Sequence, residues 1–420
     1  MRGRDRAETL RHWQRVRALL ARVPESPETL ALGVLARAQM IINEALLGQV
    51  DEAATLFAEG TGFAERLGHP ESRVMLLCAY GFVRIQAGAI EEGFTHYSQA
   101  VRLADQSGNN VLRSLTRALL APTVATRGGL REALAIGEEM ETLCGGDPDA
   151  GAQLLGVSPY GMTLVYRGWV LALLGHLAEA AQVLERAIAL AQVRREPELL
   201  ITAHMYSASW CGFAGDAARA LQHARRAVEL AEAATAKITG LGSAVALGRA
   251  HLLNEQWPDA AATLEQALAE MRARQAALHV EAIVLADLAQ AVIALGDCGR
   301  ARVLADEAVS TAQAQHTYLE VHALAARAHV VRLSDGAQAA AAIDADLQQA
   351  MAVVERTEAR GYTPLIHVER AELARLLGDE AAHQRELREA HRLFVEMGAT
   401  GHAERVGRQL SAPSAEPEEQ

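Results

Sequence analysis

The sequence predicts an all-α protein built as a right-handed helical-repeat solenoid of about nine two-helix units. Three observations predict this class. Half of the 420 residues are hydrophobic although only 4% are aromatic, one motif recurs along the chain, and the Val, Ile and Thr runs typical of strands are scarce. The apolar residues are mostly Ala and Leu, which is the composition of packed helices. We therefore expect about 19 helices and no sheet.

The repeated motif is a glycine, an alanine five positions later and a second alanine seven positions after that, as in Gly175, Ala180 and Ala187. We interpret each unit as an apolar helix A before the glycine and an amphipathic helix B after it. Glycine ends helix A because the left-handed conformation is least strained without a Cβ. Successive anchors are 40, 40, 47, 40, 40, 41, 40 and 42 residues apart: Gly48, Gly88, Gly128, Gly175, Gly215, Glu255, Gly296, Gly336 and Gly378.

The two ends of the chain depart from this pattern. Residues 8–22 predict one amphipathic helix that resembles a helix B without its helix A, and the prolines at 24–28 end it. We therefore divide the chain into an incomplete capping helix with a Pro-containing loop (1–30), a solenoid (31–410) and an acidic tail predicted to be disordered (411–420). The apolar face of the first helix is predicted to hold Leu10, Trp13, Val16, Leu19 and Leu20.

The Gly, Ala, Ala offsets resemble those of the tetratricopeptide repeat (TPR), whose usual period is about 34 residues. Segments 11–28, 145–161, 167–180 and 371–406 are also similar to the C-terminal repeat region of bacterial class III adenylate or guanylate cyclases that carry a STAND-type ATPase. This resemblance covers almost the whole chain and implies a sensing or autoinhibitory scaffold. The resemblance implies that the chain is a stand-alone relative of these proteins, a split gene product or a truncated reading frame.

The chemistry of that family does not carry over to these residues. No glycine stands five positions before Lys237, so the phosphate-binding motif of an ATPase is missing. The sheet that would hold the metal-binding Asp pair of a cyclase is not predicted. Ser158 lacks the glycine that a nucleophile elbow needs at Tyr160, and the fifteen histidines form no HExxH motif. We predict no enzyme activity, no catalytic residue, no cofactor and no metal ligand.

Charge and cysteine usage restrict the partners and the compartment. The net charge of −12 opposes direct binding to nucleic acid. Residues 1–22 hold seven Arg against Asp5 and Glu8, which gives +5 and leaves −17 for the rest. This basic helix predicts capping of the solenoid or docking on an upstream domain, with an anionic lipid surface as the alternative. Four widely spaced cysteines and the missing signal peptide and membrane span predict a reducing, cytoplasmic location.

Aromatic residues gather where the period is irregular. Six of the 17 aromatic residues lie within 160–213, directly after the seven extra residues of the 47-residue interval. One hypothesis is a recognition groove on the A helices of units four and five, with the segment 144–161 as its lip. The alternative is that the rings fill space that the insertion opens, and the exposure of the two tryptophans distinguishes the two. The groove residues are Tyr160, Tyr166, Arg167, Trp169, His204, Tyr206 and Trp210.

Three functional hypotheses remain open at this point. The first is a non-catalytic sensor or scaffold arm of a cyclase or STAND ATPase signalling system that binds a protein partner, an upstream signalling domain or a small effector. The second is an autonomous protein-interaction adaptor. The third is the arm of a transcriptional regulator. Fold alone does not separate them, because repeat arrays carry function in particular sites.

Overall fold

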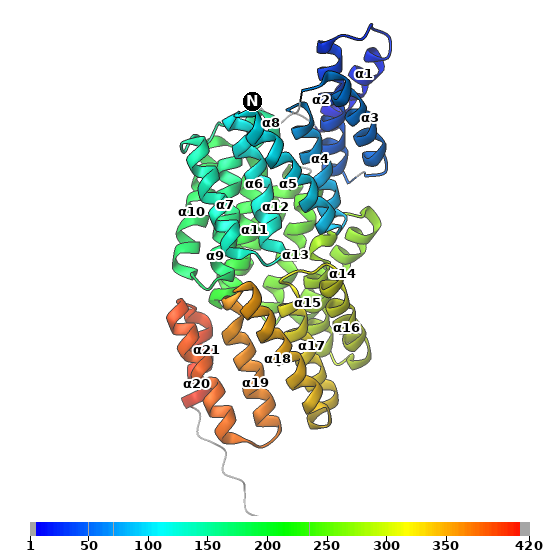
Figure 1. Ribbon diagram of the computed structural model, residues 1–420. Coiled ribbons are helices and arrows are strands. Elements are labelled where there is room, and N and C mark those ends of the chain that lie inside the picture. Colours follow the sequence, from blue (N-terminus) through cyan, green and yellow to red (C-terminus); the bar gives the residue numbers. More distant parts are fainter. Residues whose placement is uncertain (1–5, 49, 70, 235, 412–420) are drawn as a thin grey trace, which may run out of the picture.

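The computed structural model describes residues 6–48, 50–69, 71–234 and 236–411. These residues form α-helices, three short 3-10 helices and no strand, which confirms the predicted all-α class (Figure 1). The elements are α1 (Arg6–Leu20), α2 (Pro27–Leu46), α3 (Ala53–Leu67), α4 (Ser72–Gln86), α5 (Ile90–Ser107), α6 (Asn110–Thr126), α7 (Leu130–Cys144), α8 (Ala152–Leu155), α9 (Pro159–Leu173), α10 (Leu177–Arg194), α11 (Pro197–Ala214), α12 (Ala217–Ala233), α13 (Lys237–Leu253), α14 (Trp257–Arg274), η1 (Leu278–Val280), α15 (Glu281–Ala294), α16 (Cys298–Ala314), α17 (Glu320–Asp335), η2 (Gly336–Ala339), α18 (Ala340–Thr357), η3 (Arg360–Tyr362), α19 (Thr363–Leu376), α20 (Glu380–Met397) and α21 (Thr400–Ser411).

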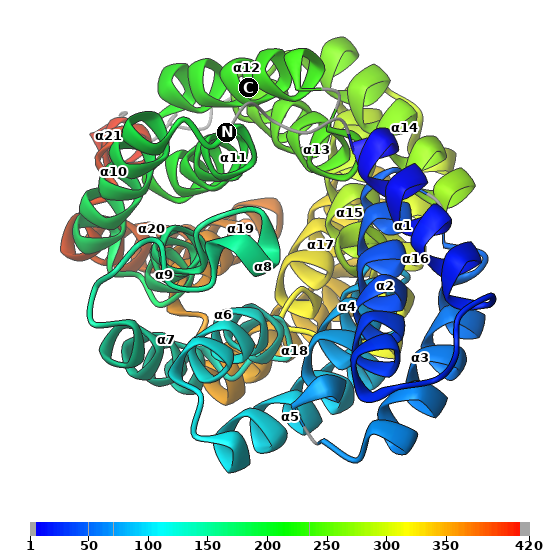
Figure 2. The ribbon, with the colours of Figure 1, turned by 90° about the horizontal axis from the view of Figure 1, so that it is seen from above.

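The helices form two concentric layers. Figure 2 shows the A helices on the inside of a ring and the B helices on the outside. The A helices are α2, α4, α6, α9, α11, α13, α15, α17 and α19, and the B helices are α3, α5, α7, α10, α12, α14, α16, α18 and α20, with α1 as an outer helix before the first A helix. Consecutive A and B helices pack side by side, so the chain is a TPR-like solenoid.

The anchor positions turn the chain from helix A to helix B. Gly175 has a φ of 87° and Gly88 one of 81°, and Glu255 adopts the same left-handed region at 58°. Small residues then let the two helices approach closely. A Cβ on Gly168 of α9 would lie 2.6 Å from Leu184 Cγ of α10, and Ala180 of α10 is completely buried. Local packing of this kind within each unit builds the array.

Successive turns of the superhelix touch one another. The backbone N–H of Ala277 donates to Gln86 Oε1 at 3.1 Å, across 191 residues, and His402 Nε2 donates to the carbonyl of Gly212 at 2.9 Å, across 190 residues. One superhelical turn therefore takes about 190 residues, or between four and five units. The second turn lies below the first in Figure 1, where α17–α21 lie under α9–α13.

Backbone packing tightens this seam between the turns. A Cβ on Gly361 of η3 would lie 2.7 Å from the carbonyl oxygen of Ala172 in α9, so only glycine fits there without movement. Nearby, Arg131 Nε and Glu358 Oε1 form an ion pair at 2.6 Å. The superhelix is therefore closed along its wall between these turns.

The irregular 47-residue interval forms a small helical insertion between α7 and α9. It contains α8, which lies inside the ring of helices in Figure 2. Ser158 fixes the start of α9, because its Oγ accepts from the N–H of Gly161 at 3.1 Å and donates to the carbonyl of Pro148 at 2.7 Å. The N–H of Ser158 donates to Glu196 Oε2 at 3.0 Å, which ties the insertion to α11.

The N-terminal helix is present but its predicted apolar face is only partly right. In α1, Leu10 is buried, whereas Leu19 is 61% exposed. The main contact of α1 is with α2, and Leu19 lies outside that contact. The predicted tail, apart from Ser411, lies outside the described residues.

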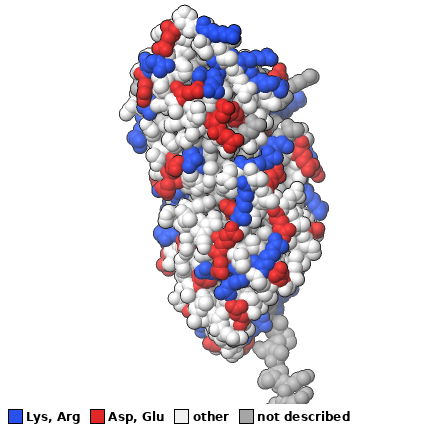
Figure 3. Space-filling model, turned by 90° about the vertical axis from the view of Figure 1, so that its right-hand side faces the viewer, with Lys and Arg blue, Asp and Glu red and all other residues white. Residues whose placement is uncertain are grey.

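The outer surface carries both signs of charge. On the face shown in Figure 3, acidic and basic side chains alternate between apolar and neutral areas. Of the helices that the structure describes, none has both the length and the apolar character that a bilayer-spanning helix requires.

Candidate functional site

Three of the seven predicted groove residues meet on the inner side of α9 and α11. The ring centroids of Tyr166 and Tyr206 are 5.6 Å apart, and those of Trp169 and Tyr206 are also 5.6 Å apart. These distances are typical of favourable aromatic pairs. Tyr166 stands nine positions and Trp169 six positions before the anchor Gly175. Residues at these two intervals before an anchor therefore face the inside of the superhelix.

Two tyrosines from the next superhelical turn complete this aromatic group. The rings of Trp169 and Tyr318 lie 5.9 Å apart, and Phe213 of α11 lies 5.2 Å from Tyr362 of η3. Trp169 is only 8% exposed. For this residue the structure supports the packing alternative, because its ring fills the seam between turns instead of standing free in a groove.

The other four predicted residues contact the outer layer. Tyr160 Oη accepts from Arg186 at 3.1 Å, and Arg167 forms ion pairs with side chains of α7 and α10. The Nδ1 atoms of His204 and His223 are 2.9 Å apart between α11 and α12. Trp210 donates to a backbone carbonyl at the start of α10. The structure therefore does not bring all seven residues together, since these four side chains extend toward B helices.

A buried ionic group continues the same inner surface along the next three A helices. Asp287 of α15 is 2% exposed. Its Oδ2 lies 3.0 Å from Arg249 Nε of α13, and its Oδ1 lies 2.7 Å from His322 Nε2 of α17. Arg249 Nη1 is 3.5 Å from Ser209 Oγ, which connects this group to α11. We call the combined set the interior site: Tyr166, Trp169, Tyr206, Arg249, Asp287, Tyr318, His322 and Tyr362.

Burial sets the protonation states of the interior site. Burial would raise the pKa of Asp287, but attraction to His322 and Arg249 outweighs it and holds that pKa below its ordinary value. Burial raises the pKa of Tyr166 and Tyr362 to about 12 and that of Tyr206 and Tyr318 further. The carboxylate is therefore charged and the phenols are neutral near pH 7.

This arrangement suits recognition of hydrogen-bond acceptors. The phenols and the Arg249 guanidinium are donors, while the single carboxylate, that of Asp287, is already engaged by Arg249 and His322. Aromatic faces beside these donors offer apolar contact area. Arg249 and His322 keep 28% and 15% of their side-chain surface exposed, so solvent reaches both.

The sequence analysis did not predict the ionic group of Arg249, Asp287 and His322, although the positions of Arg249 and Asp287 relative to the anchors indicate it. Trp169, Ser209 and Arg249 each stand six positions before an anchor, and Tyr166, Tyr206 and Asp287 each stand nine positions before one. Aligning the units on these positions would have placed all six on one inner surface. Tyr318 and Tyr362 carry no such signal, because they reach the site from inter-unit loops one superhelical turn away.

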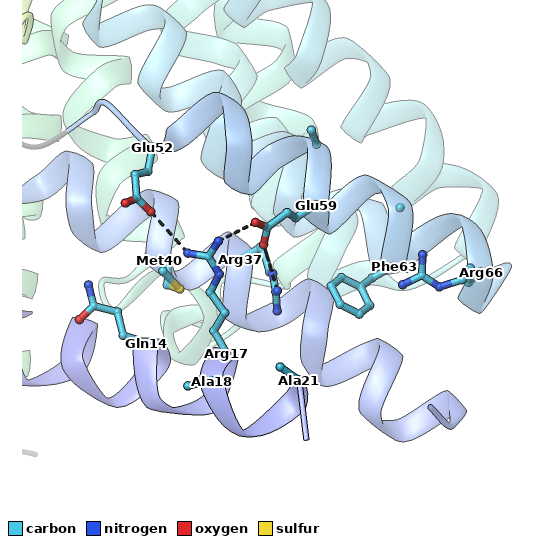
Figure 4. Close-up of a pocket in the computed structure, with 12 residues that line it drawn as sticks. Gln14, Arg17, Ala18, Ala21, Arg37, Met40, Glu52, Glu59, Phe63 and Arg66 are labelled. Carbon is cyan, nitrogen blue, oxygen red and sulfur yellow. Dashed lines mark hydrogen bonds and ion pairs between the residues drawn. The ribbon is translucent and has the colours of Figure 1, made fainter. Parts of the chain in front are cut away.

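A second feature lies outside the ring, at the N-terminal end. A groove of about 810 Å³ runs between α1 and α3 and has α2 as its floor (Figure 4). The side chains of Arg17, Arg37, Glu52 and Glu59 meet in it through ion pairs. The basic N-terminal helix predicted a capping or docking role for this region, but the sequence pattern did not indicate a groove.

Comparisons with known proteins support the fold. No protein-family model matches the chain, and no curated protein matches it. Among solved structures, the Rap protein complexed with Competence and Sporulation Factor aligns with a TM-score of 0.51 at 11% identity, over 81% of this chain and 99% of that chain. NprR in complex with its cognate peptide NprX aligns with a TM-score of 0.51 at 14% identity, over 86% and 98%.

These likenesses establish a TPR-like helical-repeat fold and nothing finer, because the identities are low. A STAND protein with a tetratricopeptide repeat sensor from Pyrococcus horikoshii aligns over 86% of this chain and 55% of its own, at 12% identity. Its TM-score of 0.45 is too low to support an argument.

Proposed function

We propose that this chain is a non-catalytic scaffold that binds a peptide segment of a partner protein on the inner surface of its A helices. The observation that carries this proposal is the convergence of the partly exposed Tyr206, Arg249 and His322 around the buried Asp287, from four successive A helices. Aromatic residues and arginine dominate binding centres because they bury a large area with few rotatable bonds.

The chemistry of the interior site favours an extended peptide. The hydrogen-bonding groups that it can offer to a ligand are donors, because the Asp287 carboxylate is already paired with Arg249 and His322. An extended backbone presents a carbonyl acceptor at each residue and is not saturated by internal hydrogen bonds. NprR, which shares the fold, is known in complex with a cognate peptide, and this agrees with the proposal.

The wider setting is proposed from the sequence alone. The resemblance to repeat regions of cyclase and STAND ATPase proteins supports a role as a sensor arm in a cytoplasmic signalling system of that type. The adaptor and regulator-arm hypotheses keep the same peptide-binding surface and differ only in what the scaffold is connected to. We propose that the chain itself turns over neither ATP nor GTP.

Site-specific photo-crosslinking in the native host tests the binding surface. A benzoylphenylalanine at Ser209, beside Arg249, should capture a partner polypeptide that mass spectrometry can identify. The matched control carries the same group at Val193, which is 83% exposed on α10. Capture at Ser209 and not at Val193 supports the proposal. Equal capture at both positions, or capture at Val193 alone, contradicts it.

A further inference from the structure

The groove between α1 and α3 is a feature that inner-surface peptide binding does not use. It lies on the outer layer, where two consecutive outer helices stand apart over α2 (Figure 4). Half of its lining residues are apolar or small, and the other half are polar or charged. Its lining is Gln14, Arg17, Ala18, Ala21, Arg37, Met40, Glu52, Ala58, Glu59, Gly62, Phe63 and Arg66.

Two glycines of α3 show that one side of this helix is uncovered. A Cβ on Gly60 would lie 2.8 Å from Leu76 Cδ1 of α4, so this side is tightly packed. A Cβ on Gly62 would meet only Arg66 Nη1, at 3.7 Å. Gly62 also has ordinary helical geometry, since it is not among the residues with positive φ. A larger side chain at 62 would therefore extend into the groove without disturbing the fold.

Arg37, on the floor of the groove, has an unsatisfied donor. The residue is only 6% exposed, and its Nε donates to Glu59 Oε2 at 3.0 Å. Its guanidinium lies over the Phe63 ring, 4.6 Å from the centroid. Its Nη1, however, has no hydrogen-bond partner. A buried charged donor without an acceptor is unfavourable, so an incoming oxygen acceptor would be bound strongly here.

The surroundings of Arg37 favour a negatively charged acceptor. The groove holds three arginines against two glutamates: Arg17, Arg37 and Arg66 against Glu52 and Glu59. Three more arginines, two on α1 and one just after it, are exposed and form no ion pair within the described part of the chain: Arg11, Arg15 and Arg22. This positive region stands out in a protein whose net charge is −12, and it would attract an acidic segment at long range.

We propose that this groove binds an acidic segment of a partner protein, which places a carboxylate against Arg37 Nη1 and an apolar side chain against Phe63. Small residues on both walls admit the segment: Ala18 of α1 and Ala21 just after it, and Ala58 and Gly62 on α3. The site is separate from the interior site, so each can fail without the other.

Selection from a library of random twelve-residue peptides displayed on phage tests this proposal without a known ligand. The bait is the full chain, and selected peptides are then synthesised and their affinities measured by fluorescence anisotropy at several salt concentrations. Gly62→Leu fills the groove and should keep the fold, because the site is open and leucine favours helix. The matched control is Gly299→Leu on α16, where the glycine is also exposed and unobstructed.

The proposal expects a family of selected peptides rich in Asp and Glu. Their affinity should fall at least tenfold in Gly62→Leu and in Arg37→Gln, stay unchanged in Gly299→Leu, and weaken with salt. Gly62→Leu should melt no lower than the wild type.

Three results would overturn the proposal. One is a selection without acidic enrichment. Another is acidic peptides that bind Gly62→Leu as tightly as the wild type. The third is capture of phosphatidylserine vesicles that Gly62→Leu abolishes, because it would assign the groove to a membrane surface.

Discussion

At the residue scale, Asp287 organises the interior site, because one buried carboxylate holds Arg249 and His322 from the two neighbouring A helices. Removing it leaves the partly exposed Arg249 guanidinium without its partner. We expect Asp287→Ala to lower the free energy of unfolding by about 1–3 kcal/mol, less than for a fully buried pair because Arg249 is partly exposed. The control is Asp259→Ala, at an exposed position of α14.

This effect should depend on pH with a defined sign. Because the folded-state pKa of Asp287 is lowered, its contribution is complete above the ordinary aspartate pKa and is lost as the pH falls through the folded value. Urea unfolding of wild type and Asp287→Ala from pH 7 to pH 3 should therefore show a difference that shrinks at the acid end. A difference that stays constant over this range would contradict the assigned charge state.

Glu44 of α2 should show the opposite behaviour. Burial, and to a lesser extent Glu52, raises its pKa to about 7. A carboxyl with a raised folded-state pKa stabilises the protein below its unfolded pKa, and that contribution is lost as the pH rises through about 7. Glu44→Gln should thus stabilise the chain at pH 8 by about 2 kcal/mol and leave it nearly unchanged at pH 4.5. Equal melting temperatures of the two proteins at pH 8 would refute this.

At the element scale, the close contact between helices A and B depends on its small residues. Ala180 of α10 is completely buried, so Ala180→Leu should overpack the α9–α10 pair and destabilise it by about 1–3 kcal/mol. Gly175→Leu should be at least as destabilising, because Gly175 has a φ of 87° and a Cβ at this position would meet the Met397 side chain. The matched control is Ala178→Leu, two positions away and exposed. Melting curves unchanged by both substitutions would contradict the packing assignment.

Much of this level was predictable from the sequence, because it depends on local signals. The period located the A and B helices, and Gly175 and Ala180 identified the turn and the contact within a unit. The predictions that failed depend on how one element packs against another. Leu19 fits the apolar face of an isolated helix, yet it lies outside the contact between α1 and α2 and is exposed. The four groove residues that extend outward failed similarly, since helical spacing does not say which layer a face meets.

At the scale of the whole molecule, the seam between superhelical turns decides what the inner surface encloses. Small rotations between neighbouring units add up over about 190 residues before two turns meet, so no local pattern predicts that Tyr318 will reach Trp169. The aromatic half of the interior site was therefore only partly predictable. The ionic half was accessible through the register of the units but needed the structure to be recognised.

The seam can be tested at its tightest point. Gly361→Val would place a Cβ 2.7 Å from the carbonyl oxygen of Ala172, a backbone atom that cannot move alone. The turns should separate, which raises the radius of gyration in small-angle X-ray scattering and lowers stability by about 1–3 kcal/mol. The control is Gly299→Val on the exposed start of α16. An unchanged scattering profile for Gly361→Val would show that the turns do not pack as described.

The most direct test of the central claim is amide hydrogen exchange of the full chain, with and without the partner segment captured at Ser209. The interior site predicts new protection in the A helices α9, α11, α13, α15 and α17, with the outer helices unchanged and the α1–α3 groove unaffected. Protection confined to B helices, or to α1 and α3, would contradict the claim that the inner surface is where this scaffold binds.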